Sequence, residues 1–253
     1  MKLVIVRHAD PDYEHDSLTQ TGFKEAKALV PRMVELNNKC GGFKNIYCSP
    51  LGRAKDTAKF TLDELGRTAI IKDWLREFPP AIKRPDLNGQ QSICWDFLPE
   101  DWTKYKEFYD ADLWCKHPIM KSVDDVEAKY KQVCTNFDEL LKEHGYERCD
   151  EKDGIYYNAI NSNNDTIVIF CHFGLESVLI SHLTHTSPMI LWHNFCTAPS
   201  SVTTIATEER REGKASFRVI QYGDTSHLYK AGLEPSFAAR FCESYTNENE
   251  RHD

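Results

Sequence analysis

Short apolar runs alternate along the chain with longer segments in which apolar residues recur at helical spacing. The runs at 2–6, 43–49, 68–72 and 166–172 are rich in β-branched residues, which is typical of strands buried in a sheet. Helices are predicted over 19–39, 50–65, 122–145 and 174–185, with Ser122 as the N-cap of the third. Strands that alternate with helices predict an α/β fold, a three-layer αβα architecture with a mostly parallel central sheet.

Three stretches depart from this alternation. Residues 79–117 are rich in proline and tryptophan, too long for a plain connection and too aromatic for a disordered linker, so we predict an inserted lid or cap segment over about 79–120. Residues 146–165 are polar and predict a surface loop or an edge hairpin. The segments 200–209 and 215–224 predict a closing pair of strands. We expect one α/β domain over 1–253.

Composition narrows the function classes. A formal net charge of −8 argues against general nucleic-acid binding, and no segment approaches the roughly 18 apolar residues that span a bilayer. The nine cysteines form no C-x-x-C pair, which predicts a reduced, cytoplasmic protein without a zinc site. The start of the chain also lacks the apolar stretch of a signal peptide. The sequence predicts neither a nucleic-acid partner nor a membrane partner, and it leaves a homodimer open.

Ionisable residues stand at three predicted strand ends. The first strand ends in Arg7-His8, the second leads to Arg53 in the next helix, and the strand 166–172 ends in His172. Because the carboxyl ends of parallel strands meet at one edge of the sheet, we expect these side chains to lie close together. Two guanidinium groups and two imidazoles near helix N-termini predict a site for a phosphate group.

The motifs around these residues resemble those of the histidine phosphatase superfamily, in its phosphoglycerate mutase-like branch. "VRHAD" resembles the family's R-H-G motif, and "SPLGRAKDTA" its S-P-L-x-R-A-x-x-T-A signature. "SLTQTGFKEAKAL", "WLREF" and "IFCHFG" resemble three further family segments, and "YGDTSHL" resembles a closing motif less specifically. The matches follow the family order across about residues 3 to 228.

The resemblance implies phosphoryl transfer through a phosphohistidine on His8. Arg7, Arg53 and His172 would bind the phosphoryl oxygens, and Glu77 would protonate the leaving group. It implies no metal and no cofactor, and a small-molecule phosphomonoester as the substrate. The inserted segment would cover the phosphate site, with its aromatic residues either facing a large leaving group or forming a small core of their own.

Some alternatives remain open on the sequence alone. The acid could be a different carboxylate from Glu77, and the competitors are Asp10, Asp12, Glu14 and Asp86. Ala9 and Phe173 both stand where the family commonly has glycine. The favoured function is a metal-independent phosphatase. The alternatives are a phosphoglycerate mutase-type phosphoryl transferase, for which Lys83 and Arg84 are candidate extra cations, and a non-catalytic phosphate-binding regulatory protein.

Overall fold

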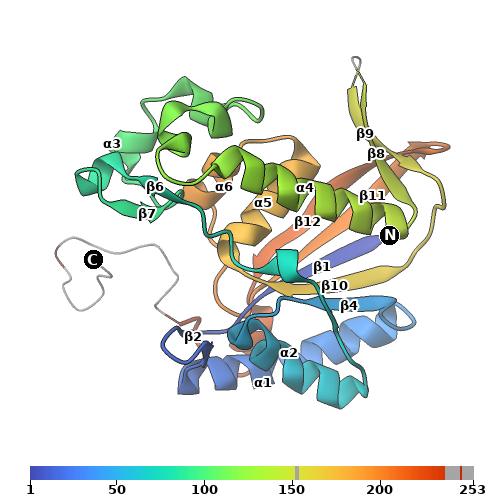
Figure 1. The fold of residues 1–253 in the computed structure, drawn as a ribbon. Helices are drawn as coiled ribbons and strands as arrows, with labels where there is room; N and C mark the ends of the chain where they lie inside the picture. The colour runs from blue at the N-terminus through green and yellow to red at the C-terminus, as the bar shows by residue number, and fades with distance from the viewer. Residues whose placement is uncertain (152–153, 237–245, 247–253) are drawn as a thin grey trace.

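The computed structural model describes residues 1–151, 154–236 and 246. Within these residues, the largest sheet has eight strands in the order β5-β4-β10-β1-β11-β12-β9-β8 (Figure 1). Four of them are mutually parallel: β1 (Lys2–Arg7), β4 (Asn45–Cys48), β5 (Ile70–Ile71) and β10 (Thr166–Cys171). The other four run antiparallel to their neighbours: β8 (Tyr146–Glu151), β9 (Gly154–Ala159), β11 (Val202–Arg211) and β12 (Lys214–Asp224).

Helices cover both faces of the sheet, which confirms the predicted α/β fold. On one face lie α1 (Gln20–Lys39) and α2 (Gly52–Leu65), whose apolar side chains pack against Val4, Val6 and Val168. On the other lie α4 (Val126–Glu143), α5 (Phe173–Thr184) and α6 (Pro188–Asn194), as Figure 1 shows. Because successive strand residues point to opposite faces, Leu3 and Ile5 of β1 enter this second core. The short α7 (Ser226–Lys230) packs on α1.

The parallel strands are confined to one half of the sheet. The predicted closing pair is β11 and β12, and the polar stretch 146–165 forms the edge hairpin of β8 and β9. The helix predicted from Ser122 begins instead at Val126, because the carboxylate of Asp125 accepts the Ala128 N–H and caps the helix there. The helix predicted from Pro50 begins at Gly52.

Residues 79–120 form small elements that pack on α5 and α6 rather than a separate layer. Phe97, Trp102, Phe108 and Trp114 are buried in the same core as Trp192 of α6, and the rings of Trp114 and Trp192 meet edge to face at 5.4 Å. Most of the insertion's aromatic residues therefore contribute to the core, and its role as a lid stays a prediction. Its elements are β6 (Ala81–Lys83), β7 (Gln91–Ile93), α3 (Pro99–Trp102) and short 3-10 turns at 85–87, 106–109, 114–116 and 118–121.

Two further elements lie near the first strand end. Directly after Arg7-His8, the two-residue strand β2 (Pro11–Asp12) pairs antiparallel with the two-residue strand β3 (Ser17–Leu18). A 3-10 turn, η1 (Asp73–Leu75), follows β5 and leads to Glu77. Among the described residues, no helix combines the length and the apolar character that crossing a membrane requires.

Candidate active site

The register of two neighbouring parallel strands brings the two predicted site histidines together. Arg7 pairs with Cys171 across β1 and β10, so the next residues, His8 and His172, leave adjacent strands side by side. The His8 N–H donates to the Cys171 carbonyl at 2.9 Å, and the centroids of the two imidazole rings are 5.0 Å apart. The predicted convergence at the strand ends is thus present in the structure.

The His8 imidazole is fixed with one nitrogen free. Its Nδ1 lies 2.8 Å from the carbonyl oxygen of Ala9, and because a carbonyl can only accept a hydrogen bond, Nδ1 carries the proton. The side chain is buried, and this burial, followed by the charge of Arg7, lowers the pKa of His8 well below its ordinary value. His8 is therefore a neutral imidazole whose Nε2 lone pair is available for bonding to an electrophile.

His172 is held by one hydrogen bond from the end of β4. Its Nε2 lies 2.8 Å from the hydroxyl oxygen of Ser49, and its buried Nδ1 has no partner among the described residues. Burial, then the neighbouring His8 and the positive charges of Arg53 and Arg7, lower the pKa of His172. The unpartnered Nδ1 is a polar group that an incoming ligand can satisfy.

Both predicted arginines are anchored at one end of the guanidinium and unpartnered at the other. Arg7 donates from Nη1 to the Thr197 carbonyl at 2.6 Å, and its guanidinium lies over the Phe173 ring at 5.2 Å. Arg53 donates from Nη1 to a carboxylate oxygen of Asp16 at 2.7 Å. The Nε atoms of both arginines are buried without a partner among the described residues. Buried N–H donors of this kind favour an anion with several acceptor oxygens.

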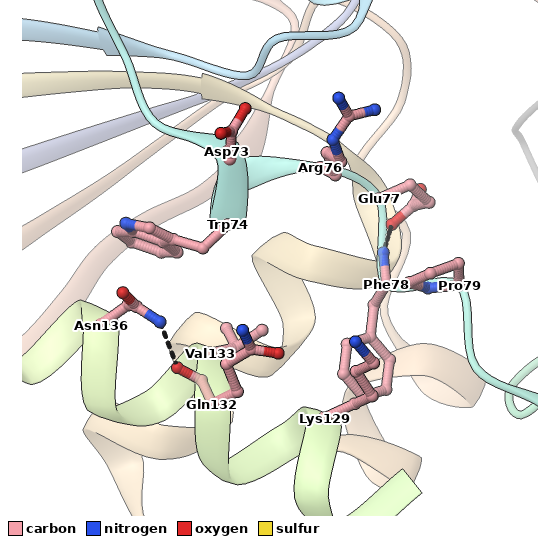
Figure 2. A pocket seen from close by; sticks show the side chains of 10 residues that line it. All are labelled: Asp73, Trp74, Arg76, Glu77, Phe78, Pro79, Lys129, Gln132, Val133 and Asn136. Carbon is pink, nitrogen blue, oxygen red and sulfur yellow. Dashed lines mark hydrogen bonds between the residues drawn. The ribbon is translucent and has the colours of Figure 1, made fainter. Parts of the chain in front are cut away.

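Glu77 reaches the start of α5, the helix that follows His172. Its Oε1 accepts the backbone N–H of Leu175 at 3.0 Å and of Phe78 at 2.8 Å, a bond drawn in Figure 2. Burial raises the pKa of Glu77, and the charge of Arg7 opposes this rise. A carboxyl group with a raised pKa near Arg7 can hold a proton and donate it.

Three of the four competing carboxylates, those of Asp10, Asp12 and Asp86, have other partners. Asp10 accepts a hydrogen bond from the Thr19 hydroxyl at 2.5 Å, and Asp12 pairs with His15 in solvent. Asp86 pairs with the buried Arg84 inside the insertion, where Arg84 also donates to the Trp95 carbonyl at 2.8 Å. Arg84, a candidate extra cation, is thus committed to holding the insertion together. Among the described residues, no group of three or more histidine, cysteine, aspartate or glutamate side chains could hold a metal ion.

A comparison with models of known protein families identifies the same family as the sequence motifs did. The family model described as histidine phosphatase superfamily (branch 1) matches residues 3–149, more than half of the chain. The chain belongs to this superfamily. His172 lies beyond the matched range, so its place in the site rests on the strand register and on its contacts. A search of curated protein sequences finds no match.

Solved structures of three phosphatases share the histidine phosphatase fold. One is phosphoserine phosphatase from Entamoeba histolytica in complex with phosphoserine, 19% identical with a TM-score of 0.57, covering 90% of this chain and 98% of that one. Another is α-ribazole phosphatase from Shigella flexneri, 20% identical with a TM-score of 0.52, covering 89% of this chain and 97% of that one. A mycobacterial glucosyl-3-phosphoglycerate phosphatase is 18% identical with a TM-score of 0.52, covering 88% and 98%.

Sequence reasoning missed three supports of this histidine phosphatase site. Ser49 lies inside a quoted motif but received no role, and Asp16 comes from a loop with no recognisable signal. Glu176 is the third, and it does carry a signal, because it is a lone acid within the otherwise apolar and polar-neutral start of α5. Its carboxylate is buried, and burial raises its pKa to about 7 although the positive charge of Arg7 favours the ionised form.

Proposed function

We propose that this protein is a metal-independent phosphatase that hydrolyses small phosphomonoesters through a phosphohistidine on His8. The observation that carries the proposal is the His8 imidazole, whose Nδ1 is tied to the Ala9 carbonyl while Nε2 is free beside two arginines. A binding protein has no need of a neutral nucleophile held in this way, which favours catalysis over a regulatory role.

The reaction would proceed in two steps. Nε2 of His8 attacks phosphorus, the bond from phosphorus to the ester oxygen breaks, and Glu77 gives its proton to the leaving oxygen. Water then attacks the phosphohistidine, Glu77 takes a proton from that water, and phosphate leaves with His8 restored. The unpartnered donors of Arg7 and Arg53, with Nδ1 of His172, would bind the phosphoryl oxygens and stabilise their charge in the transition state.

The substrate class rests on two kinds of support. The similar solved structures are a phosphoserine phosphatase, an α-ribazole phosphatase and a glucosyl-3-phosphoglycerate phosphatase, all named for small molecules. The net charge of −8 also disfavours a nucleic-acid substrate. We also propose a cytoplasmic location for the protein. The sequence leaves open whether it forms a homodimer.

The test is turnover of a panel of phosphomonoesters by the wild type and the His8→Ala variant in the presence of a chelator. We expect phosphate release by the wild type only, and a phosphate on His8 that survives base and is lost in acid after rapid quenching. Release of free phosphate without an isomeric phosphoester separates a phosphatase from a mutase. Full activity of His8→Ala, or activity that requires an added metal, would contradict the proposal.

A further inference from the structure

A cavity of about 350 Å³ lies between the segment 73–79 and α4, and Glu77 forms part of its wall. Figure 2 shows the rings of Trp74 and Phe78 on the side of this segment that faces α4. The charged and apolar residues that line the cavity include Asp73, Trp74, Arg76, Glu77, Lys129 and Val133. A cavity of about 150 Å³ holds benzene, so this one has room for a six-membered ring with a short substituent.

Neither histidine lines the cavity, but two of its lining residues also interact with the candidate active site. Glu77 lines it and also accepts a hydrogen bond from Leu175, in the first turn of the helix that follows His172. Arg76 lines it too, and the positive charge of Arg76 contributes to the lowered pKa of His172. A phosphoester with its phosphoryl group at His8 would therefore place its leaving oxygen beside Glu77 and the rest of its alcohol toward this cavity.

Two cations, Lys129 and Arg76, line the cavity together with the carboxylates of Glu77 and the exposed Asp73. Lys129 and Arg76 are both exposed, and neither forms an ion pair with any carboxylate in the described part of the chain. Lys131, two residues further along α4, instead pairs with Glu127 at 2.8 Å. The cavity combines the aromatic ring of Trp74, the apolar Val133 and two free cations, and this combination suits a ring or short apolar body that carries an acidic group.

We propose that this cavity binds the leaving group, and that the protein prefers phosphomonoesters of alcohols or phenols with a compact apolar body ending in a carboxylate. This inference rests on the proposed phosphatase function. Trp74 and Val133 would contact the body, and Lys129, across the cavity from Glu77, would bind the carboxylate. Of the remaining polar lining, Asp73 carries one negative charge, which opposes that of one cation, and the Asn136 amide already donates to the Gln132 carbonyl at 2.7 Å.

Three matched aryl phosphates test the preference: phenyl phosphate, its para-propanoate derivative and its para-aminoethyl derivative. They share the phosphoryl group and the ring and differ in the charge at the far end. One exposed ion pair changes an affinity by up to about fivefold, so two cations predict that kcat/KM for the propanoate exceeds that for the amine by about tenfold or more.

Two substitutions of Lys129 test whether its charge sets this preference. Lys129→Met should reduce the preference for the propanoate over the amine to about threefold, and Lys129→Glu should reverse it in favour of the amine. A reversal is a gain of activity that misfolding cannot produce. The matched control is Lys131→Met on the same helix, which should keep the wild-type preference because Lys131 does not line the cavity.

The outcomes separate this inference from the proposed function. If the wild type hydrolyses phenyl phosphate in a His8-dependent way but shows equal kcat/KM for the propanoate and the amine, the phosphatase stands and the leaving-group site is wrong. The same conclusion follows if Lys129→Glu keeps the wild-type preference. If other phosphomonoesters are hydrolysed in a His8-dependent way but none of the three aryl esters is, the leaving-group site is wrong. If no phosphomonoester is hydrolysed, the proposed function itself is contradicted.

Discussion

Gly174, the second residue of α5, lies against the proposed acid Glu77. A single methyl group added at Gly174 should therefore lower the activity strongly while lowering the stability only slightly. A Cβ at this position would lie 2.8 Å from Oε1 of Glu77 and 3.0 Å from Nε1 of Trp95. Since the Glu77 carboxylate is the movable end of a side chain, Gly174→Ala should displace it rather than the helix. Reaching an ordinary contact of about 3.4 Å requires Oε1 to retreat by about 0.6 Å.

The size of the effect follows from the bonds that this retreat stretches. A shift of about 0.6 Å away from α5 lengthens the 3.0 Å bond from the Leu175 N–H beyond hydrogen-bonding distance. Leaving the Leu175 N–H without its partner costs about 1–3 kcal/mol, and alanine in place of glycine returns up to about 1 kcal/mol in a helix. We expect a net loss of about 1 kcal/mol in the free energy of unfolding. Misplacing a catalytic group by about 1 Å costs on the order of 100-fold, so kcat should fall by about 10- to 100-fold.

The assay compares two leaving groups. Nitrophenolate leaves without protonation, whereas the alkoxide of glycerol 2-phosphate needs the acid. Gly174→Ala should therefore slow glycerol 2-phosphate hydrolysis by about 10- to 100-fold and 4-nitrophenyl phosphate hydrolysis by less than about threefold. In a Glu77→Gln background the same substitution should add little, because both changes act on one group. Equal losses on the two substrates, or full additivity with Glu77→Gln, would show that Glu77 is not the acid.

Two further predictions concern buried titratable groups. His193 accepts the Phe97 N–H at Nε2, and burial lowers its pKa to about 4, so the neutral form is the one that stabilises the fold. That stability, about 3 kcal/mol, is present above about pH 6.5 and is lost as the pH falls toward 4. Urea unfolding of the wild type and of His193→Gln between these pH values should show that the free energy of unfolding falls more steeply in the wild type. Parallel pH dependence of the two proteins would contradict the assignment. Glu176 lies near Arg7 and has its pKa raised to about 7, so its ionised form should weaken phosphate binding by Arg7. The ratio of kcat/KM for Glu176→Gln to that of the wild type should therefore rise between pH 6 and pH 8. A constant ratio would exclude an effect of Glu176 ionisation on phosphate binding.

The sequence predicted the parallel strands and the residues at their ends, because both depend on local patterns. An apolar run followed by Arg7-His8 needs only the strand period and the rule that parallel strand ends converge. The supports of the site were harder to predict, because they come from contacts between segments far apart in the chain. The bond between Arg53 and Asp16 spans 37 residues, and the bond from Arg7 to the Thr197 carbonyl spans 190.

The sequence left the role of the insertion's aromatic residues open for the same physical reason. Its tryptophans give no helical or strand period, so the sequence could not say which surface they cover. The structure buries Trp102 and Trp114 against α6, a helix that was itself not predicted, and leaves Trp95 near the site, with its Nε1–H donating to the Phe78 carbonyl at 3.1 Å. Trp95 is therefore the aromatic residue of the insertion that can influence Glu77, through the backbone of the next residue.

The two departures from the family pattern are compatible with the fold for different reasons. Ala9 has no positive φ, so the conformational freedom of glycine is not needed there. Its methyl group is fully buried, its N–H donates to the Thr57 hydroxyl at 2.9 Å and its carbonyl fixes the His8 tautomer. Phe173 supplies a ring over which the Arg7 guanidinium lies, an attraction that glycine could not provide. Alanine thus leaves the support of His8 intact, and phenylalanine adds a contact that holds Arg7 in place.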